Sequence, residues 1–147
     1  MVDFGNLQSF QVTRDTVAEL SLSIPPLKDD ADPVLLLVRP ATSANKPYFN
    51  AMLRRNTKLT SRAARGAKID ANMMDESIQH DRELYPHHVI VGWQNVFDAT
   101  GAAVSFNTEA CKDFVAALPN WVFDEIRSFC GTSSNFIDAD TEGKAKN

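Results

Sequence analysis

The stretch from His87 to Phe106 constrains the fold of this chain more than any other part of the sequence. It begins with an apolar run that ends in Gly92-Trp93, and a short segment containing Asp98 and Gly101 follows. These two residues bracket a tight reversal, because glycine adopts the positive φ that other residues resist. The order of run and turn predicts that the chain reverses direction between Trp93 and Phe106.

After this turn the chain is expected to run extended and then to enter a helix. In Val104–Phe106 two apolar residues flank a serine, which is typical of a short extended piece with one face inward. Asn107 or Thr108 supplies a side-chain oxygen that caps the first helical turn, and Glu109 lies near the positive end of the helix. The apolar stripe of this helix, at spacings of three and four, is Cys111, Phe114, Val115 and Leu118.

A second short helix is expected after a proline corner. Pro119 breaks the first helix, Asn120 offers a new cap for residues 121–130, and Gly131 fits the C-terminal stop. The apolar side of this second helix is expected to consist of Trp121, Val122, Ile126, Phe129 and Cys130.

The N-terminal part of the chain is expected to form a β-hairpin. From Val17 to Ile24 apolar and polar residues alternate at period two, which indicates a half-buried strand. Pro25-Pro26 ends that strand, an acidic loop follows, and Val34–Val38 predicts a second, more fully buried strand. The simplest arrangement is an antiparallel pair joined by a long loop.

The middle of the chain has helical composition with a basic segment inside it. Ser43–Pro47 fits a helix start, and Tyr48 and Met52 form its apolar side. Residues 56–68 carry almost no large apolar side chains, so they are a linker, a flexible arm or a helix ordered only by a partner. Helical composition returns over residues 69–84, and Tyr85-Pro86 is expected to end that helix.

These patterns predict one α+β domain over residues 1–147. Its parts are a β-hairpin region (1–42), helices with a basic linker (43–84), a turn module with two short helices (85–137) and a flexible tail (138–147). A chain of this length buries a real core, and 44% apolar and 23% charged residues fit a soluble globular protein.

No group of residues has the spacing of a catalytic or metal site, so we expect a non-enzymatic protein without cofactor or metal. His80, His87 and His88 have no cysteine or acid that completes a tetrahedral set, and adjacent histidines in a strand would point to opposite faces. Cys111 and Cys130 fall in helical stripes and are expected to be small buried residues in a reducing cytoplasm. No apolar run reaches the ~18 residues that span a bilayer. Residues 1–4 lack a basic start followed by an apolar core, so we do not expect the protein to be secreted.

Charge is distributed unevenly along the chain. Residues 33–69 hold eight basic and no acidic residues, which leaves 7 basic and 19 acidic residues elsewhere, a net of +8 against −12. This segment predicts a solvated or protein-binding basic face, and nucleic-acid binding is the sharper alternative. Only Tyr48 and Phe49 accompany it as aromatics, and both are expected to be core anchors. The candidate basic face is Arg54, Arg55, Lys58, Arg62, Arg65 and Lys68.

The order of turns and apolar anchors resembles the phage tail assembly chaperone family, over roughly Tyr85 to Phe136. The matching motifs are Val91-Gly92-Trp93, Asp98 to Gly101, Val104-Ser105-Phe106, Asn107-Thr108-Glu109, Leu118-Pro119 and Asn135-Phe136. The resemblance implies a protein that coats the long, helical tape-measure protein and keeps it soluble until tail-tube subunits polymerise around it. It does not extend to the N-terminal half.

A protein of this kind needs apolar patches with a polar rim. The candidate partner-binding residues are Trp93, Phe97, Phe114, Trp121, Phe123 and Phe129. Partners are therefore expected to be phage structural proteins, either the tape-measure protein or capsid and tail subunits, and further copies of the chain itself. The expected location is the host cytoplasm during assembly.

Two alternatives come from other parts of the sequence. A hairpin from Leu20 to Val38 with an exposed edge could add a strand to a neighbour, as in a head-decoration, connector or tail-associated subunit of the virion. A small nucleic-acid-binding regulator would instead use the basic face, with binding that falls steeply as salt rises.

Overall fold

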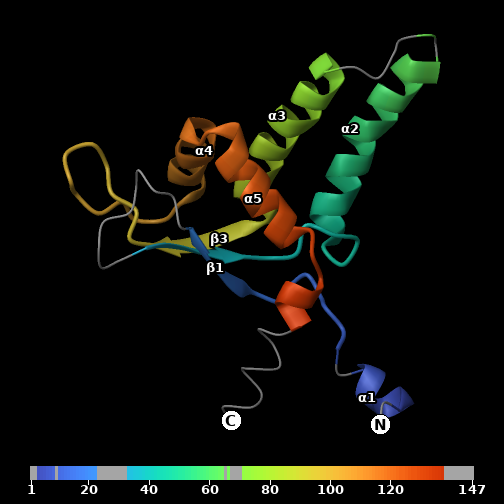
Figure 1. Ribbon diagram of the computed structural model, residues 1–147, viewed down its shortest axis with the longest axis horizontal. Coiled ribbons are helices and arrows are strands. Elements are labelled where there is room, and N and C mark those ends of the chain that lie inside the picture. Colours follow the sequence, from blue (N-terminus) through green and yellow to red (C-terminus); the bar gives the residue numbers. More distant parts are fainter. Residues whose placement is uncertain (1–2, 9, 23–32, 65, 67–70, 138–147) are drawn as a thin grey trace.

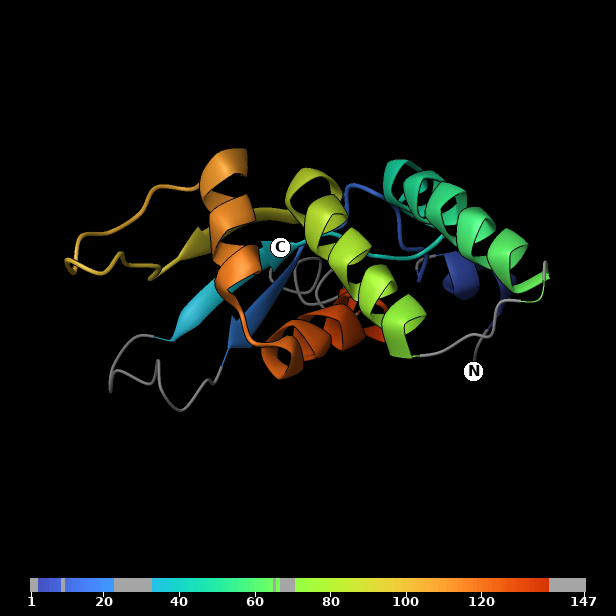
Figure 2. The same cartoon turned by 90° about the horizontal axis from the view of Figure 1, so that it is seen from above.

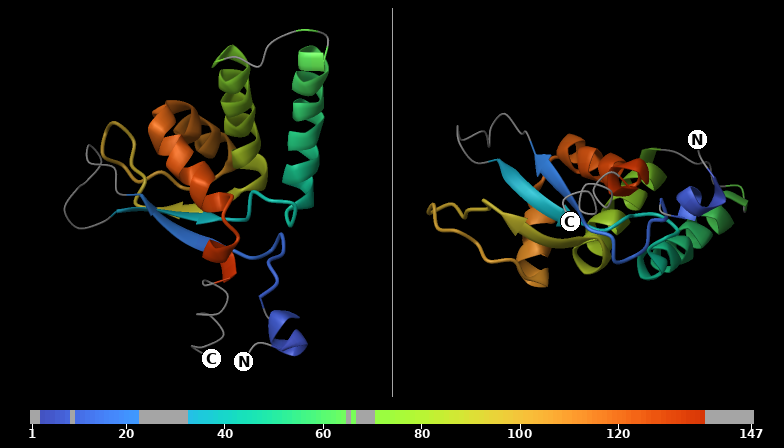
Figure 3. Two further views of the ribbon diagram at one scale, coloured as in Figure 1. Left: turned by 45° about the vertical axis from the view of Figure 1, so that its right-hand side comes forward. Right: turned by 90° about the horizontal axis from the view of Figure 1, so that it is seen from below.

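A three-stranded antiparallel sheet carries the longer helices of the chain on one of its sides (Figures 1 and 3). The structure is a computed structural model and describes residues 3–8, 10–22, 33–64, 66 and 71–137. In chain order its elements are α1 (Phe4–Gln8), β1 (Ala18–Leu22), β2 (Val34–Val38), α2 (Lys46–Ala64), α3 (Ala71–His88), β3 (Ile90–Gln94), α4 (Thr108–Ala117) and α5 (Asn120–Cys130). This arrangement confirms the α+β class expected from the sequence.

The predicted hairpin is present, and β3 extends it into a sheet. β1 pairs antiparallel with β2, so that Leu20 lies opposite Leu36. β3 pairs with the other edge of β2, which brings Trp93 opposite Leu36 as well, and the register shifts between Leu37 and Val38. The order β1-β2-β3 therefore joins the turn module to the hairpin across more than fifty residues of sequence.

The two faces of the sheet differ in burial. Residues paired directly across strands share a face, so Leu36, Leu20 and Trp93 lie on one side. That side packs on the helices and holds the core, with Leu36 fully buried. On the opposite face Leu37 lies over Gly92, where a Cβ atom would be 3.0 Å from Leu37 Cδ1.

The helices α2 and α3 are longer than the sequence suggested. α2 continues through Ala64, so much of the segment expected as a linker over residues 56–68 is helical. α3 runs past Pro86 to His88, although we expected it to end at Tyr85-Pro86. Tyr85 explains the difference, because its side chain is buried and its carbonyl accepts a hydrogen bond from Val89 N at 3.0 Å. The proline removes only its own N–H from the ladder near the helix end. His87 and His88 consequently lie in a helical turn and not in a strand.

The structure confirms the predicted turn at Gly101 and the predicted cap at the start of α4. Gly101 has φ of 85°, and Asp98 Oδ1 accepts hydrogen bonds from Thr100 N at 2.8 Å and Ala102 N at 3.1 Å. Asn107 is the residue that caps α4, because its Oδ1 accepts from Ala110 N at 2.8 Å. At Val104–Phe106 the inward face is as expected, because Val104 and Phe106 are half-buried against the core and Ser105 is exposed. No strand is assigned to these three residues, and the neighbouring pairing is a single bridge between Phe97 and Ala103.

The start of α5 also differs from the expectation. Asn120 is the first residue of the helix and does not cap it, because Pro119 occupies the cap position without a side-chain hydrogen bond. The buried side of α5 is Val122, Phe123, Ile126 and Cys130. Trp121, which was expected on that side, is 50% exposed. The apolar stripe therefore begins one residue later than the sequence pattern indicated.

Figure 2 views the molecule from above and shows α3 between α2 and α4. α1 lies away from the sheet and the other helices (Figures 1 and 3). In the part of the chain that the structure describes, no helix combines the length and the apolarity that crossing a membrane requires. The expected flexible tail at 138–147 lies outside the described residues.

Candidate functional site

The six aromatic residues expected to bind a partner fall into three groups. Phe123 is fully buried, so it belongs to the core and cannot serve as a docking residue in this fold. Trp93, Phe114 and Phe129 are half-buried and pack against the core. Phe97 and Trp121 are exposed, with 57% and 50% of their surfaces open to solvent.

Trp93 closes the turn module. Its indole Nε1 donates a hydrogen bond to Val104 O at 2.8 Å. Its ring meets Phe106 edge-on at 5.0 Å between centroids and lies 5.4 Å from the ring of Phe114 on α4. Ring pairs at these distances stabilise packing beyond their area burial. The Gly-Trp pair is therefore an internal anchor that holds the loop of residues 95–107 against α4.

Phe97 and Trp121 remain as the exposed rings of the six. Phe97 sits beside the Asp98–Gly101 turn, and Trp121 lies in the first turn of α5. Large apolar side chains exposed in this way are candidates for contact with another protein. Phe4 in the N-terminal segment is 89% exposed and was not among the predicted partner-binding residues. The signal in the sequence was the spacing of three between Phe4, Leu7 and Phe10. The other large apolar side chains that are exposed in the described part of the chain are Leu7, Phe10, Val17, Leu53 and Met74.

The expected basic face is only partly described. Arg54 is exposed on α2, whereas Arg55 donates to Glu83 of α3 at 3.2 Å. Lys58 and Arg62 belong to α2, but their side chains lie outside the described residues, as do Arg65 and Lys68 entirely. The structure therefore brings one of these basic residues into an ion pair with α3 and leaves another on the surface.

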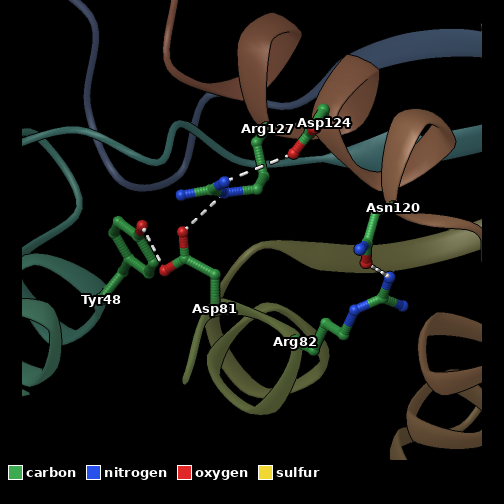
Figure 4. Close-up of polar contacts among 6 residues, drawn as sticks. All are labelled: Tyr48, Asp81, Arg82, Asn120, Asp124 and Arg127. Carbon is green, nitrogen blue, oxygen red and sulfur yellow. Dashed lines mark hydrogen bonds and ion pairs between the residues drawn. The ribbon is translucent and has the colours of Figure 1, made fainter. Parts of the chain in front are cut away.

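A buried carboxylate links three helices (Figure 4). Asp81 of α3 accepts a hydrogen bond from the Tyr48 hydroxyl of α2 at 3.0 Å and one from Arg127 Nε of α5 at 2.8 Å. Burial and the Asp81 charge raise the pKa of Tyr48. Burial works against the charge of Arg127, but the Asp81 carboxylate outweighs it and raises the pKa of Arg127. This network fixes how α2, α3 and α5 pack and offers no open site for chemistry.

A second arginine of α3 faces α4 and α5. The Arg82 guanidinium donates to Val115 O and, through Nη2, to Asn120 Oδ1 at 2.7 Å (Figure 4). Its Cζ lies 4.9 Å from the ring centre of Phe123. Asn120, which the sequence suggested as a helix cap, is therefore a partner of this arginine.

Arg82 also lines a groove of about 520 Å³ between α3 and α4. The other lining residues are Gln79, Glu83, His87, Lys112 and Ala116. No sequence pattern pointed to this groove, because it depends on how α3 and α4 pack.

The thiols lie in the core, and His87 and His88 lie in the last turn of α3. Cys111 and Cys130 are buried and unpaired, and burial raises the pKa of the Cys111 thiol to about 12. Burial and the neighbouring His87 lower the pKa of His88. Over the described ranges no three His, Cys, Asp or Glu side chains lie close enough together to hold a metal ion.

Fold and surface together define a small α+β protein with exposed aromatic side chains and a groove. Residues 43–147 match the family of the YdaY prophage protein, which is more than two thirds of the chain. The chain belongs to the YdaY prophage protein family and is thus a phage-derived protein. The match runs from the start of α2 to the C-terminus and leaves out the β1-β2 hairpin. No curated protein and no solved structure matches the chain.

Proposed function

We propose that this phage protein is a non-enzymatic assembly factor, a tail assembly chaperone that binds the tape-measure protein. It works in the host cytoplasm, as a homo-oligomer and without a cofactor. Membership of a prophage protein family supports its role in phage biology. The motifs from Gly92-Trp93 to Asn135-Phe136, which resemble those of tail assembly chaperones, lie within the matched residues.

The observation that carries the proposal is the pair of exposed aromatic rings, Phe97 and Trp121. Both sit on well-defined local structure, one beside a hydrogen-bonded turn and the other in the first turn of α5. A side chain on a rigid element loses little conformational entropy when it binds. Aromatic anchors of this kind dominate the energetics of protein interfaces. A helical partner with an apolar stripe would gain by covering them.

The test is co-expression of the chain with the tape-measure protein of the same prophage, followed by measurement of the soluble fraction of the tape-measure protein. The wild-type chain is expected to keep it in solution and to co-purify with it. The Phe97→Ala/Trp121→Ala double variant is expected to fold and to lose most of this effect. Leu53→Ala is the matched control, because Leu53 is also exposed but lies on α2, away from the turn module. If the tape-measure protein is equally soluble without the chain, the proposal is wrong.

A second candidate function, a structural subunit of the virion, is supported by the sheet edge. β1 is one of the two edge strands in the order β1-β2-β3, and no other strand of the described residues pairs with its outer edge, so that edge could pair with a strand of a neighbour. Mass spectrometry of purified particles separates the two functions. A chaperone is absent from finished particles, whereas a structural subunit is present in many copies.

A further inference from the structure

We propose that the groove between α3 and α4 binds a helix of the partner through a carboxylate on that helix. The identity of the partner as a tape-measure protein rests on the function proposed above. The chemistry of the groove, in contrast, follows from the residues that line it.

The groove has walls from two helices. Gln79, Glu83 and His87 recur every fourth residue along α3 and lie on one face of it, while Lys112 and Ala116 show the same spacing on α4. Four of these five are exposed residues, so the groove opens to solvent along its length. A volume of about 520 Å³ is ample for side chains that enter from an approaching helix.

Arg82 places an uncompensated positive charge in this groove. Its described hydrogen-bond acceptors are neutral, namely the Val115 carbonyl and the Asn120 side chain, and its third neighbour is the Phe123 ring. Its Nε is buried and has no partner among the described residues. Arg127, by comparison, has Asp81 beside it at 2.8 Å. A guanidinium without a counter-charge favours an anion nearby, because a partly buried site screens charge less than water does.

The other charges of the groove leave its potential positive. Glu83 is the acidic residue among the lining side chains, and it forms an exposed ion pair with Arg55 of α2 at 3.2 Å. With Arg82, Lys112 and Arg55 on one side and Glu83 and Glu109 on the other, the charged side chains in and beside the groove carry a net charge of 3 − 2 = +1. Lys112 pairs with Glu109 at 3.1 Å, but the Glu109 side chain is 82% exposed. Such an exposed pair contributes little energy, so a carboxylate of the partner can replace Glu109 at low cost. The groove thus offers the Lys112 amine for direct contact with an incoming acid, and the charge of Arg82 attracts that acid from the side of α3.

A helix fits this groove better than a small free anion does. Sites for small ligands usually enclose most of the ligand, whereas the residues lining this groove are largely exposed. Ala116 is the smallest of them and leaves room for a side chain of a third helix. Helices pack at axial separations of about 8–10 Å, so a helix that lies along the groove would bring its side chains within reach of α3 and α4 together. The occupant is therefore a helix that carries glutamate or aspartate beside small apolar residues.

The first experiment uses the full chain and a synthetic helical peptide with glutamate at every fourth position among alanine and leucine. A second peptide with glutamine in place of glutamate is the probe control. Backbone amide signals of residues 79–85, 87 and 112–116 are expected to shift with the glutamate peptide and much less with the glutamine peptide. If both peptides bind equally, or if the shifts lie elsewhere, the groove proposal is wrong.

The second experiment reverses the charge of one groove residue. Lys112→Glu is expected to weaken binding of the glutamate peptide about tenfold, which corresponds to about 1.4 kcal/mol. Lys112→Gln, which removes the charge and alters the fold less, is expected to weaken it about threefold. Arg14→Glu is the matched control, because it makes the same charge change at an exposed side chain in the segment before β1. Equal weakening by Lys112→Glu and Arg14→Glu would mean that only net charge matters, which contradicts the proposal.

The third experiment separates this proposal from the proposed function. The Lys112→Glu variant is co-expressed with the tape-measure protein, and loss of that protein's solubility is expected. If the wild-type chain and Lys112→Glu both keep it soluble, the chaperone function stands and the groove is not its docking site. If the wild-type chain fails to keep it soluble but the glutamate peptide still binds as predicted, the groove chemistry stands and the tape-measure protein is not its partner.

Discussion

Asp81 on α3 and Arg127 on α5 form an ion pair, with 2.8 Å between Oδ2 and Nε, beneath the junction of three helices. Asp81 is 7% exposed and Arg127 is half-buried, so solvent screens the pair only in part. The other carboxylate oxygen accepts the Tyr48 hydroxyl of α2 at 3.0 Å. One buried carboxylate thus fixes the positions of α2 and α5 relative to α3.

Replacement of Asp81 by asparagine is expected to lower the free energy of unfolding by about 2 kcal/mol. The change keeps an acceptor for Tyr48 but leaves the partly buried charge of Arg127 without its counter-ion, which is costly. Urea denaturation at pH 7 measures this loss. Asp124→Asn is the control, because Asp124 is an exposed partner of Arg127 at 3.5 Å and should cost less than about 0.5 kcal/mol. Equal effects from the two variants would contradict the role assigned to Asp81.

Truncation of two aromatic residues on α5, Phe123 and Trp121, is expected to destabilise the protein to very different extents. Phe123→Ala removes a fully buried ring that lies 5.2 Å from Tyr85, so it should destabilise the protein by about 3–5 kcal/mol. Trp121→Ala removes a half-exposed ring and should cost about 1 kcal/mol or less. Thermal unfolding of the isolated protein distinguishes them. A folded Phe123→Ala protein of wild-type stability would show that the core is not built as described.

The thiols and tyrosines are expected to make the protein sensitive to alkali. Burial raises the pKa of Cys111 to about 12, and burial also raises the pKa of Cys130 and of Tyr85. Their protonated forms are favoured in the folded state, so their contribution is complete below the unfolded pKa of a thiol, near 9. It is lost as the pH rises from there towards the folded pKa. Each of the two thiols contributes about 2 kcal/mol over the interval from pH 8 to pH 10.5, so the unfolding free energies at these two pH values should differ by about 4 kcal/mol or more.

The same burial predicts how the thiols react. A thiol reagent at pH 8 is expected to modify neither Cys111 nor Cys130 in the folded protein and to modify both in urea, because only the accessible thiolate reacts. Rapid modification of the folded protein would contradict the burial of these residues.

Gly101 is expected to be sensitive to substitution because of its backbone and not its surroundings. Its φ is 85°, and nothing lies within 4 Å of where a Cβ atom would be. Gly101→Ala should therefore cost about 1 kcal/mol through backbone strain alone. Gly101→Asn should cost less, because asparagine tolerates positive φ better than alanine does. Chemical denaturation of both variants tests this order, and an alanine variant as stable as the wild type would contradict it.

Local features of the fold could be predicted from the sequence. The alternation before Pro25 and the apolar run Val34–Val38 gave the hairpin, and Asp98, Gly101 and Asn107 gave the turn and the cap of α4. In each case the signal lies within a few neighbouring residues. Short-range hydrogen bonds and φ preferences decide such features.

Features that depend on tertiary packing could not be predicted in the same way. The pairing of Trp93 with Leu36 joins segments far apart in the sequence. The continuation of α3 past Pro86 depends on burial of the Tyr85 ring against Tyr48 and Phe123. The sequence predicted Trp121 on the buried side of α5, but the structure buries Phe123 and exposes Trp121. Spacing alone cannot choose between the two, because either residue continues a row of apolar residues at helical intervals.

The candidate site could be predicted only in part, because it too depends on tertiary packing. Phe97 and Trp121 were among the six expected docking residues, but their exposure is a property of the packed molecule. The groove beside Arg82 was not foreseen, because its walls come from α3 and α4, which are separated by β3 and the turn. The spacing of residues in the sequence therefore predicted neither the groove nor its charge.

The most direct test of the proposed chaperone function is the soluble fraction of the tape-measure protein when it is produced with this chain and without it. If the chain is such a chaperone, the tape-measure protein is expected to be insoluble alone and to be soluble and bound to the chain when the wild-type chain is present. With the Phe97→Ala/Trp121→Ala variant it is expected to be largely insoluble. A tape-measure protein that stays soluble by itself, or that remains insoluble beside the folded wild-type chain, would contradict the account.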